Sequence, residues 1–209
     1  MSREYMYMME DVLENVVSTS GVSSLVSVAA YVFTALALYT IAQRREIKKA
    51  WLAWVPVLNV WILGSISDQY RYVVKGEVRN KRKVLLTISI LHFLASAVAV
   101  IKLVIASFMV VYNYAPGVGL TEMLHQLLSS LVFFIPVAIL GVVSLIFRII
   151  SLYDVYTSCD PANNVLYLVL SLIPGVNSIT QPLFLFLCRN QDGGMPPRRE
   201  SVQENPAEF

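Results

Sequence analysis

Four long apolar stretches, separated by short polar links, dominate the pattern of this chain. They cover residues 22–41, 84–112, 124–150 and 165–187. An apolar stretch of about 20 residues is long enough to cross a hydrocarbon core of roughly 30 Å as a helix. We therefore predict an all-α integral membrane protein in which the first three stretches are full transmembrane helices. The fourth stretch holds two prolines and one asparagine, so it fits a helical hairpin or a kinked span.

A fifth apolar stretch, Trp51–Gly64, is shorter and also contains proline and asparagine. Its sequence, "WLAWVPVLNVWILG", contains Pro56 and Asn59 near the middle. Proline disrupts the preceding helical turn, and asparagine tolerates unusual backbone angles and can bond to backbone groups that the proline frees. The stretch therefore fits either a re-entrant hairpin that turns near Pro56 and Asn59 or a proline-kinked span.

Basic residues flank this fifth stretch on both sides. Residues 43–49 carry four basic and one acidic side chain (4 − 1 = +3), and residues 68–83 carry six basic and two acidic ones (6 − 2 = +4). The positive-inside rule assigns both links to the cytoplasm, and it assigns the acidic N-terminus and the link 113–123, which has no basic residue, to the outside. A re-entrant hairpin keeps both basic links on one side, whereas a span would separate them. We predict a multi-pass plasma-membrane protein with its C-terminus in the cytoplasm.

Composition supports this class and divides the chain into three parts. The chain is 56% hydrophobic and only 14% charged, whereas soluble domains carry roughly a quarter charged residues. Residues 1–21 are acidic, with apolar side chains at helical spacing, which fits an amphipathic helix at the membrane surface or a frayed segment. Residues 189–209 are polar and rich in proline and glycine, so we predict disorder. The membrane domain is then 22–188.

Two related halves, 22–67 and 124–188, make up most of this domain. "LYTIAQRREIKKAWLAWVPVLN" (38–59) can be laid beside "LYDVYTSCDPANNVLYLVLSLIPGVN" (152–177). Both segments begin with Leu-Tyr at the end of an apolar helix, cross a polar link, and reach a Pro-x-x-Asn turn. Because each turn follows a helix of the same predicted direction, the repeat is parallel.

A resemblance rests on the run "AWLAWVPVLN", 50–59, and on the second Pro-x-x-Asn at Pro174 and Asn177. The pattern of a basic link, a tryptophan and an aliphatic-Pro-x-x-Asn turn resembles a group of small bacterial membrane proteins of uncharacterised function. The resemblance covers the two repeat regions, and it implies an all-helical bacterial membrane protein without a known activity. The link "REIKKAW" departs from the Lys-x-Gly type of that group.

Polar side chains inside apolar stretches are candidate sites, because a charge within a membrane helix is costly. Lys102 is the first candidate, either binding an anionic group inside the bundle or extending toward an interface. His92 lies ten residues earlier and can share a broad helical face with it, where an interhelical contact is expected. With Asn59 and Asn177 these residues form the predicted intramembrane polar site, and Glu122 is a possible partner of Lys102.

The basic link after the fifth stretch is expected to contact anionic lipid headgroups rather than nucleic acid, because it lies next to the membrane. The residues concerned are Arg71, Lys75, Arg79, Lys81, Arg82 and Lys83. Ala95 and Ala99 have the small-xxx-small spacing that permits close helix packing, within the chain, with a second copy or with another membrane protein.

Enzyme signatures are lacking from the sequence. We find no metal-binding H-E-x-x-H, no Gly-x-Ser-x-Gly and no phosphate-binding glycine-rich loop, so no catalytic residue, metal or cofactor is predicted. A helix-end salt bridge beside Arg148 and a cap before Pro161 account for Asp154 and Asp160. Three function classes follow: a non-enzymatic scaffold or accessory subunit, a small-solute or ion transporter with Asn59, Asn177 and Lys102 on its path, and a membrane-embedded enzyme.

Overall fold

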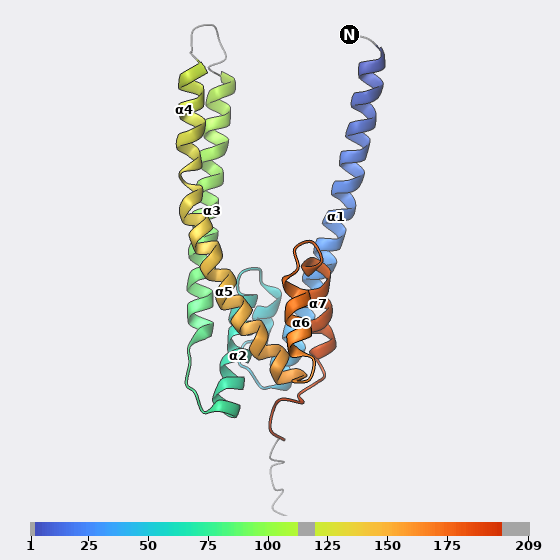
Figure 1. Ribbon diagram of the computed structural model, residues 1–209, viewed down its shortest axis with the longest axis vertical. Coiled ribbons are helices and arrows are strands. Elements are labelled where there is room, and N and C mark those ends of the chain that lie inside the picture. The colour runs from blue at the N-terminus through green and yellow to red at the C-terminus, as the bar shows by residue number, and fades with distance from the viewer. Residues whose placement is uncertain (1–2, 113–119, 198–209) are drawn as a thin grey trace, which may run out of the picture.

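The computed structural model describes residues 3–112 and 120–197, which are helical throughout apart from turns and links (Figure 1). No strand occurs in these two ranges, so the all-α prediction is confirmed. The helices are α1 (Arg3–Arg44), η1 (Ala50–Trp54), α2 (Asn59–Lys75), α3 (Lys81–Tyr112), α4 (Leu120–Leu131), α5 (Phe134–Cys159), α6 (Asn164–Leu172) and α7 (Asn177–Cys188). Three segments are long and apolar enough to cross a membrane, Ser23–Arg44, Lys81–Met109 and Leu128–Cys159, as predicted.

The first span extends further than its apolar stretch. Helix α1 runs without interruption from Arg3 to Arg44, so the helix predicted within residues 1–21 is continuous with the first span. No proline separates the two segments, and the single Gly21 lowers helix propensity by only about 1 kcal/mol relative to alanine.

The third span is broken near its start and longer at its end than the apolar stretch 124–150. A turn at Val132–Phe133 separates α4 from α5, and Pro136 is the third residue of α5. Proline is tolerated in a first helical turn, because those N–H groups have no partner within the helix. Helix α5 then continues to Cys159, directly before Asp160 and Pro161.

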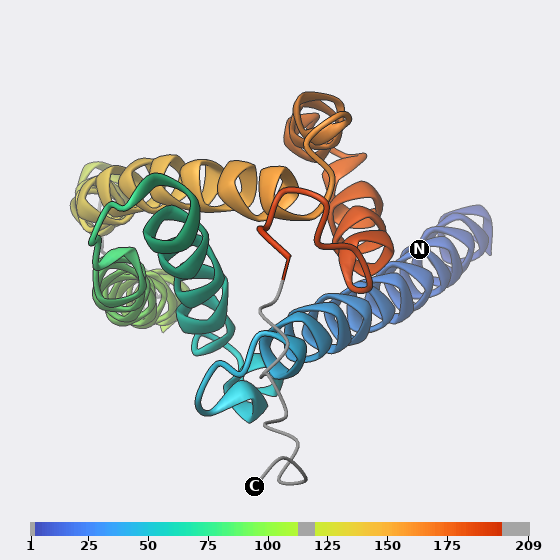
Figure 2. The ribbon, with the colours of Figure 1, turned by 90° about the horizontal axis from the view of Figure 1, so that it is seen from below.

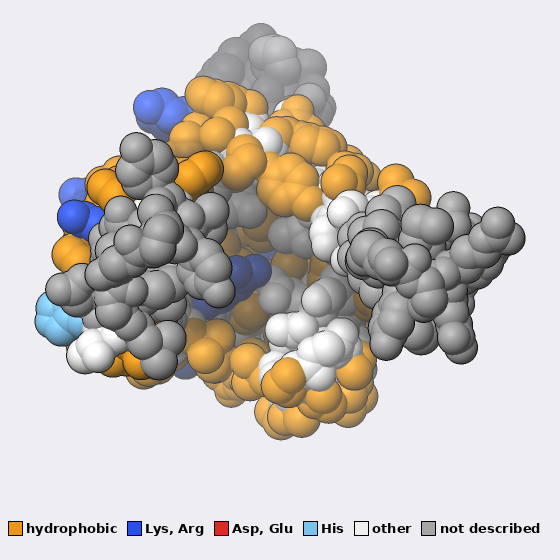
Figure 3. Space-filling model, turned by 90° about the horizontal axis from the view of Figure 1, so that it is seen from above, with side chains coloured by type: hydrophobic (Ala, Val, Ile, Leu, Met, Phe, Trp, Pro, Cys, Tyr) orange, Lys and Arg blue, Asp and Glu red, His pale blue; other side chains and the backbone are white. Residues whose placement is uncertain are grey.

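The hydrophobic core lies in the lower half of the molecule, where α1, α2, α5 and α7 meet. Ile41, Ile62, Ile66, Tyr156 and Leu185 are all at most 1% exposed there. Above this core, α1 and the pair formed by α3 and α4 extend as two separate arms (Figure 1). The arms display large hydrophobic side chains, and the described surface seen from above is mostly apolar (Figure 3). Such a surface is suited to contact with lipid.

Close packing of α2 against α3 requires a glycine. A Cβ atom at Gly64 would lie 2.5 Å from the Cα atom of Arg82, closer than real atoms approach. The next turn of α2 contributes Asp68, whose carboxylate accepts hydrogen bonds from the backbone N–H groups of Lys81 (2.9 Å) and Arg82 (3.2 Å). Asp68 thus satisfies two of the unpaired donors at the start of α3.

The two basic links are neighbours in the fold. The Gln69 side chain donates a hydrogen bond of 3.1 Å to the backbone carbonyl of Arg45, joining residues 43–49 to residues 68–83. The fifth apolar stretch lies between them in the sequence, as a short rise through η1 followed by the descent of α2 (Figure 1).

The start of the polar C-terminal segment, where the sequence predicts disorder from residue 189, makes several contacts with the helices. Asp192 pairs with Arg44 and Arg45, and the Gly193 N–H donates to the carbonyl of Cys159 (2.9 Å). Residues up to 197 cross the lower face of the helices (Figure 2). Residues 198–209 lie outside the described part of the chain.

Candidate functional site

The two Pro-x-x-Asn turns have the same backbone structure. In each, the asparagine is the first residue of a helix, and its N–H donates to the carbonyl of the residue before the proline: Asn59 to Val55 at 3.1 Å and Asn177 to Ile173 at 3.0 Å. In each, the residue after the proline has a left-handed backbone, with φ 68° at Val57 and 85° at Gly175.

The asparagine side chains therefore do not make the hydrogen bonds to backbone groups that the sequence predicted for them. Within the described ranges, the Asn59 side chain has no hydrogen-bond partner, and the Asn177 amide oxygen accepts only a long bond of 3.4 Å from Ser178. Backbone groups in the turns satisfy one another, so the amides of Asn59 and Asn177 remain available to a ligand.

Both amides open on one cavity of about 520 Å³. This volume lies within the range of small-molecule sites, about 300–1,000 Å³. Helices α1, α2, α5, α6 and α7 all contribute to its wall. Its polar lining consists of Tyr31, Thr34, Asn59, Arg148, Ser171, Asn177, Ser178 and Gln181. The lining thus comes from residues in both 22–67 and 124–188.

Arg148 is the charged member of this lining. It lies near the middle of α5, about 16 Å along the axis from the helix end at Cys159 (11 residues at 1.5 Å). None of the described carboxylates forms an ion pair with it. The salt bridge that we predicted between Arg148 and Asp154 is absent, because six residues along a helix turn the two side chains about 120° apart.

Asp154 instead forms the centre of a buried polar cluster below the cavity. Its side chain is 0% exposed, and its Oδ2 atom accepts from Ser67 Oγ (2.5 Å), Arg71 Nε (2.9 Å) and Lys81 Nζ (2.5 Å). This cluster ties α2 and α3 to α5. The hydrogen bond to Asp154 is also the main cause that raises the pKa of the Arg71 guanidinium.

Two of the six predicted headgroup contacts belong to this buried cluster, and the other four are exposed. Lys81 is 6% exposed and is committed to Asp154, and Arg71 is shared between Asp154 and Glu77. The four that remain exposed at the same end of the molecule are Lys75, Arg79, Arg82 and Lys83.

Lys102 and His92 lie elsewhere. The Lys102 ammonium is 5.4 Å from the centre of the Phe133 ring, at the junction of α4 and α5, and the side chain is exposed. The His92 ring lies beside Gly141 of α5, where its Nε2 atom would be 3.5 Å from a Cβ atom added to the glycine. Because α3 packs on α4 and α5 and does not border the cavity, the structure groups Asn59 with Asn177 but not with Lys102 or His92. The Glu122 side chain lies outside the described residues.

Sequence reasoning missed Arg148 and Gln181. The signal for Arg148 was the one used for Lys102, a charge in an apolar stretch, but the stretch appeared to end at Ile150. Because α5 continues for nine further residues, Arg148 is a mid-helix residue. The carboxylate of Asp160 accepts from the Ala162 N–H (3.1 Å) next to Pro161, within the turn before α6, whose cap residue is Asn163.

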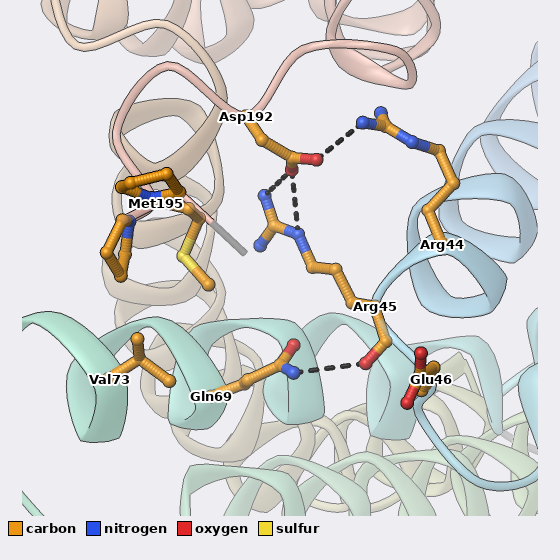
Figure 4. A pocket seen from close by; sticks show the side chains of 9 residues that line it. Arg44, Arg45, Glu46, Gln69, Val73, Asp192 and Met195 are labelled. Atoms are coloured by element: carbon orange, nitrogen blue, oxygen red, sulfur yellow. Dashed lines mark hydrogen bonds and ion pairs between the residues drawn. The ribbon is translucent and has the colours of Figure 1, made fainter. Parts of the chain in front are cut away.

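A second cavity, of about 650 Å³, opens at the lower end between α1, α2 and the C-terminal segment (Figure 4). Asp192 accepts hydrogen bonds from Arg44 (2.5 Å) and from Arg45 (2.8 Å), so one carboxylate faces two guanidinium groups. The buried Arg45 Nη1 and Gln69 Oε1 atoms have no hydrogen-bond partner within the described structure.

Comparison with known protein families, curated proteins and solved structures finds no significant match to this chain.

Proposed function

We propose that this chain is a non-enzymatic, multi-pass component of a bacterial plasma membrane, a scaffold or accessory subunit that holds a polar ligand between its two halves. One observation carries the proposal: the Pro-x-x-Asn turns of the two halves open on a single cavity through Asn59 and Asn177. Three candidate spans supply the surrounding membrane domain.

The proposal includes two re-entrant hairpins, 50–75 and 164–188, that enter and leave on the cytoplasmic side. The hydrogen bond between Gln69 and the Arg45 carbonyl supports this for the first hairpin, because the ends of a full span would lie about 30 Å apart. For the second hairpin, the contact of Gly193 with Cys159 likewise brings the two flanking links together. The N-terminus is then outside and the C-terminus in the cytoplasm.

A non-enzymatic role is favoured by the way the polar groups are used. The Asp154 Oδ2 atom accepts from three donors. The cavity lining contains neither a carboxylate nor a histidine that could act as a base. In the described ranges there is also no group of three side chains able to hold a metal ion.

The second candidate is a transporter or channel, because broken helices that expose polar groups at mid-membrane depth form the binding sites of many transporters. Reconstitution of the pure protein in liposomes separates the two functions. A scaffold or accessory subunit predicts that chloride, phosphate and potassium fluxes equal those of empty liposomes. A flux that is abolished by Asn59→Leu and Asn177→Leu would establish the transporter instead.

A further inference from the structure

We infer that the cavity beside the two Pro-x-x-Asn turns binds a phosphate-type anionic group through Arg148. The inference rests on the proposed function, since it names the chemistry of the ligand held between the two halves.

The first observation is that the positive charge of Arg148 has no counter-charge in the cavity lining. Arg148 brings one full positive charge and five N–H donors, and no carboxylate lines the same cavity. The acid on the same helix, Asp154, is already bonded to Arg71 and Lys81. An arginine near the centre of a membrane helix is costly unless a partner neutralises it, so an anionic ligand is the partner that fits this cavity.

The second observation is that side chains lining the same cavity have unused hydrogen-bond donors. Asn59, Asn177 and Gln181 each bring an amide NH₂ group, and none of the three donates a hydrogen bond to another described residue. By contrast, the Tyr31 and Thr34 hydroxyls already donate to backbone carbonyls of Trp54 (2.7 Å) and Ala30 (2.9 Å). Unused donors of two helices, α2 and α7, thus line the same cavity as the Arg148 guanidinium, a group that binds the oxygens of phosphate in pairs.

The apolar part of the lining indicates that an apolar moiety could be attached to the anionic group. Leu145, Ile149, Leu152 and Leu172 border the same space, and about 520 Å³ exceeds what a bare phosphate needs. A lipid headgroup with the start of its acyl chains and a free anion share the chemistry that Arg148 recognises, so the experiment must distinguish them.

The test uses the full chain, purified in a zwitterionic detergent. Short-chain phosphatidylglycerol, short-chain phosphatidylcholine and inorganic phosphate are titrated separately while the thermal unfolding midpoint is followed. We expect phosphatidylglycerol to raise the midpoint saturably and phosphatidylcholine to leave it unchanged. A response to phosphate as well would identify a free anion as sufficient, and a response to phosphatidylglycerol alone would identify the lipid headgroup.

Variants then assign the effect to the cavity. Arg148→Gln should weaken the apparent affinity for the responding anion about ten-fold or more, because a charge-assisted contact is lost. Lys48→Gln removes an exposed basic charge that lies outside the cavity and outside the predicted headgroup contacts, and it should bind as the parent does. Arg148→Lys keeps the charge without the planar fork and should be intermediate. Gln181→Leu should weaken binding several-fold, and this keeps the test decisive if Arg148→Gln fails to fold.

Two results would overturn the inference: no anion-dependent shift in the parent protein, or equal affinities for the parent, Arg148→Gln and Gln181→Leu. Either can occur while the liposome and thiol-labelling results still support the proposed function, so the two failures are distinguishable.

Discussion

Val57 and Gly175 adopt the same left-handed backbone conformation, each directly after the proline of a Pro-x-x-Asn turn. Glycine reaches this region without steric cost, whereas a left-handed conformation costs other residues about 1–2 kcal/mol. The first turn therefore keeps its shape in spite of a β-branched residue, and the second keeps it with the residue best suited to it.

This pair gives a reciprocal prediction. Gly175→Val should lower the free energy of unfolding by about 1–2 kcal/mol, through backbone strain alone, because no atom lies within 4 Å of where its Cβ would be. Val57→Gly should be neutral or stabilising. Thermal unfolding of both variants in detergent checks this. An unchanged midpoint for Gly175→Val would contradict the left-handed conformation at residue 175.

The buried cluster around Asp154 predicts strong coupling between distant residues. Asp154→Asn leaves the Lys81 ammonium and the Arg71 guanidinium without their counter-charge, and breaking such a buried pair costs about 3–5 kcal/mol. Adding Lys81→Met to Asp154→Asn should restore part of the lost stability. Denaturant unfolding of the parent, both single variants and the double variant measures the coupling. Additive losses would show that the two side chains act independently.

These two features mark what the sequence could and could not predict. The spans and the paired turns are visible because they rest on local patterns, about 20 apolar residues or a Pro-x-x-Asn four residues long. Asp154 is joined to Lys81 and Arg71, 73 and 83 residues away, and no periodicity indicates which basic residue a carboxylate will choose. Arg148 was hidden for a related reason, since its apolar stretch gave no sign that α5 would continue through a polar segment to Cys159.

Helix packing yields a prediction with a matched control. Gly64→Ala places a methyl group 2.5 Å from the backbone of Arg82, so α2 and α3 must move apart, at about 1–3 kcal/mol. Gly141→Ala meets only the flexible His92 side chain, at 3.5 Å, and should be tolerated. Melting temperatures of the two variants should therefore differ, and equal values would contradict the close approach of α2 and α3.

Asp160 predicts a pH dependence. Its hydrogen bond from the Asn163 side chain, together with the Ala162 N–H, holds the pKa of the carboxyl below its usual range. The folded-state pKa is then below the unfolded one, so the stabilisation is present above about pH 4 and is lost as the pH falls through the folded-state pKa. The melting temperature of the parent should exceed that of Asp160→Asn at pH 7, and the difference should vanish at low pH. A difference that grows on acidification would show that the pKa of Asp160 is not lowered in the folded state.

The central claim is that the stretch 51–64 enters and leaves the membrane on the cytoplasmic side, which puts Asn59 beside the cavity. Labelling of single cysteines tests it most directly. Lys48→Cys and Arg79→Cys replace exposed residues on either side of the stretch, and the native Cys159 and Cys188 are buried, so the parent supplies the background. With an impermeant thiol reagent outside intact cells, neither cysteine should react, and both should react after the cells are opened. Labelling of one of the two in intact cells would show that the stretch spans the membrane, which contradicts the account.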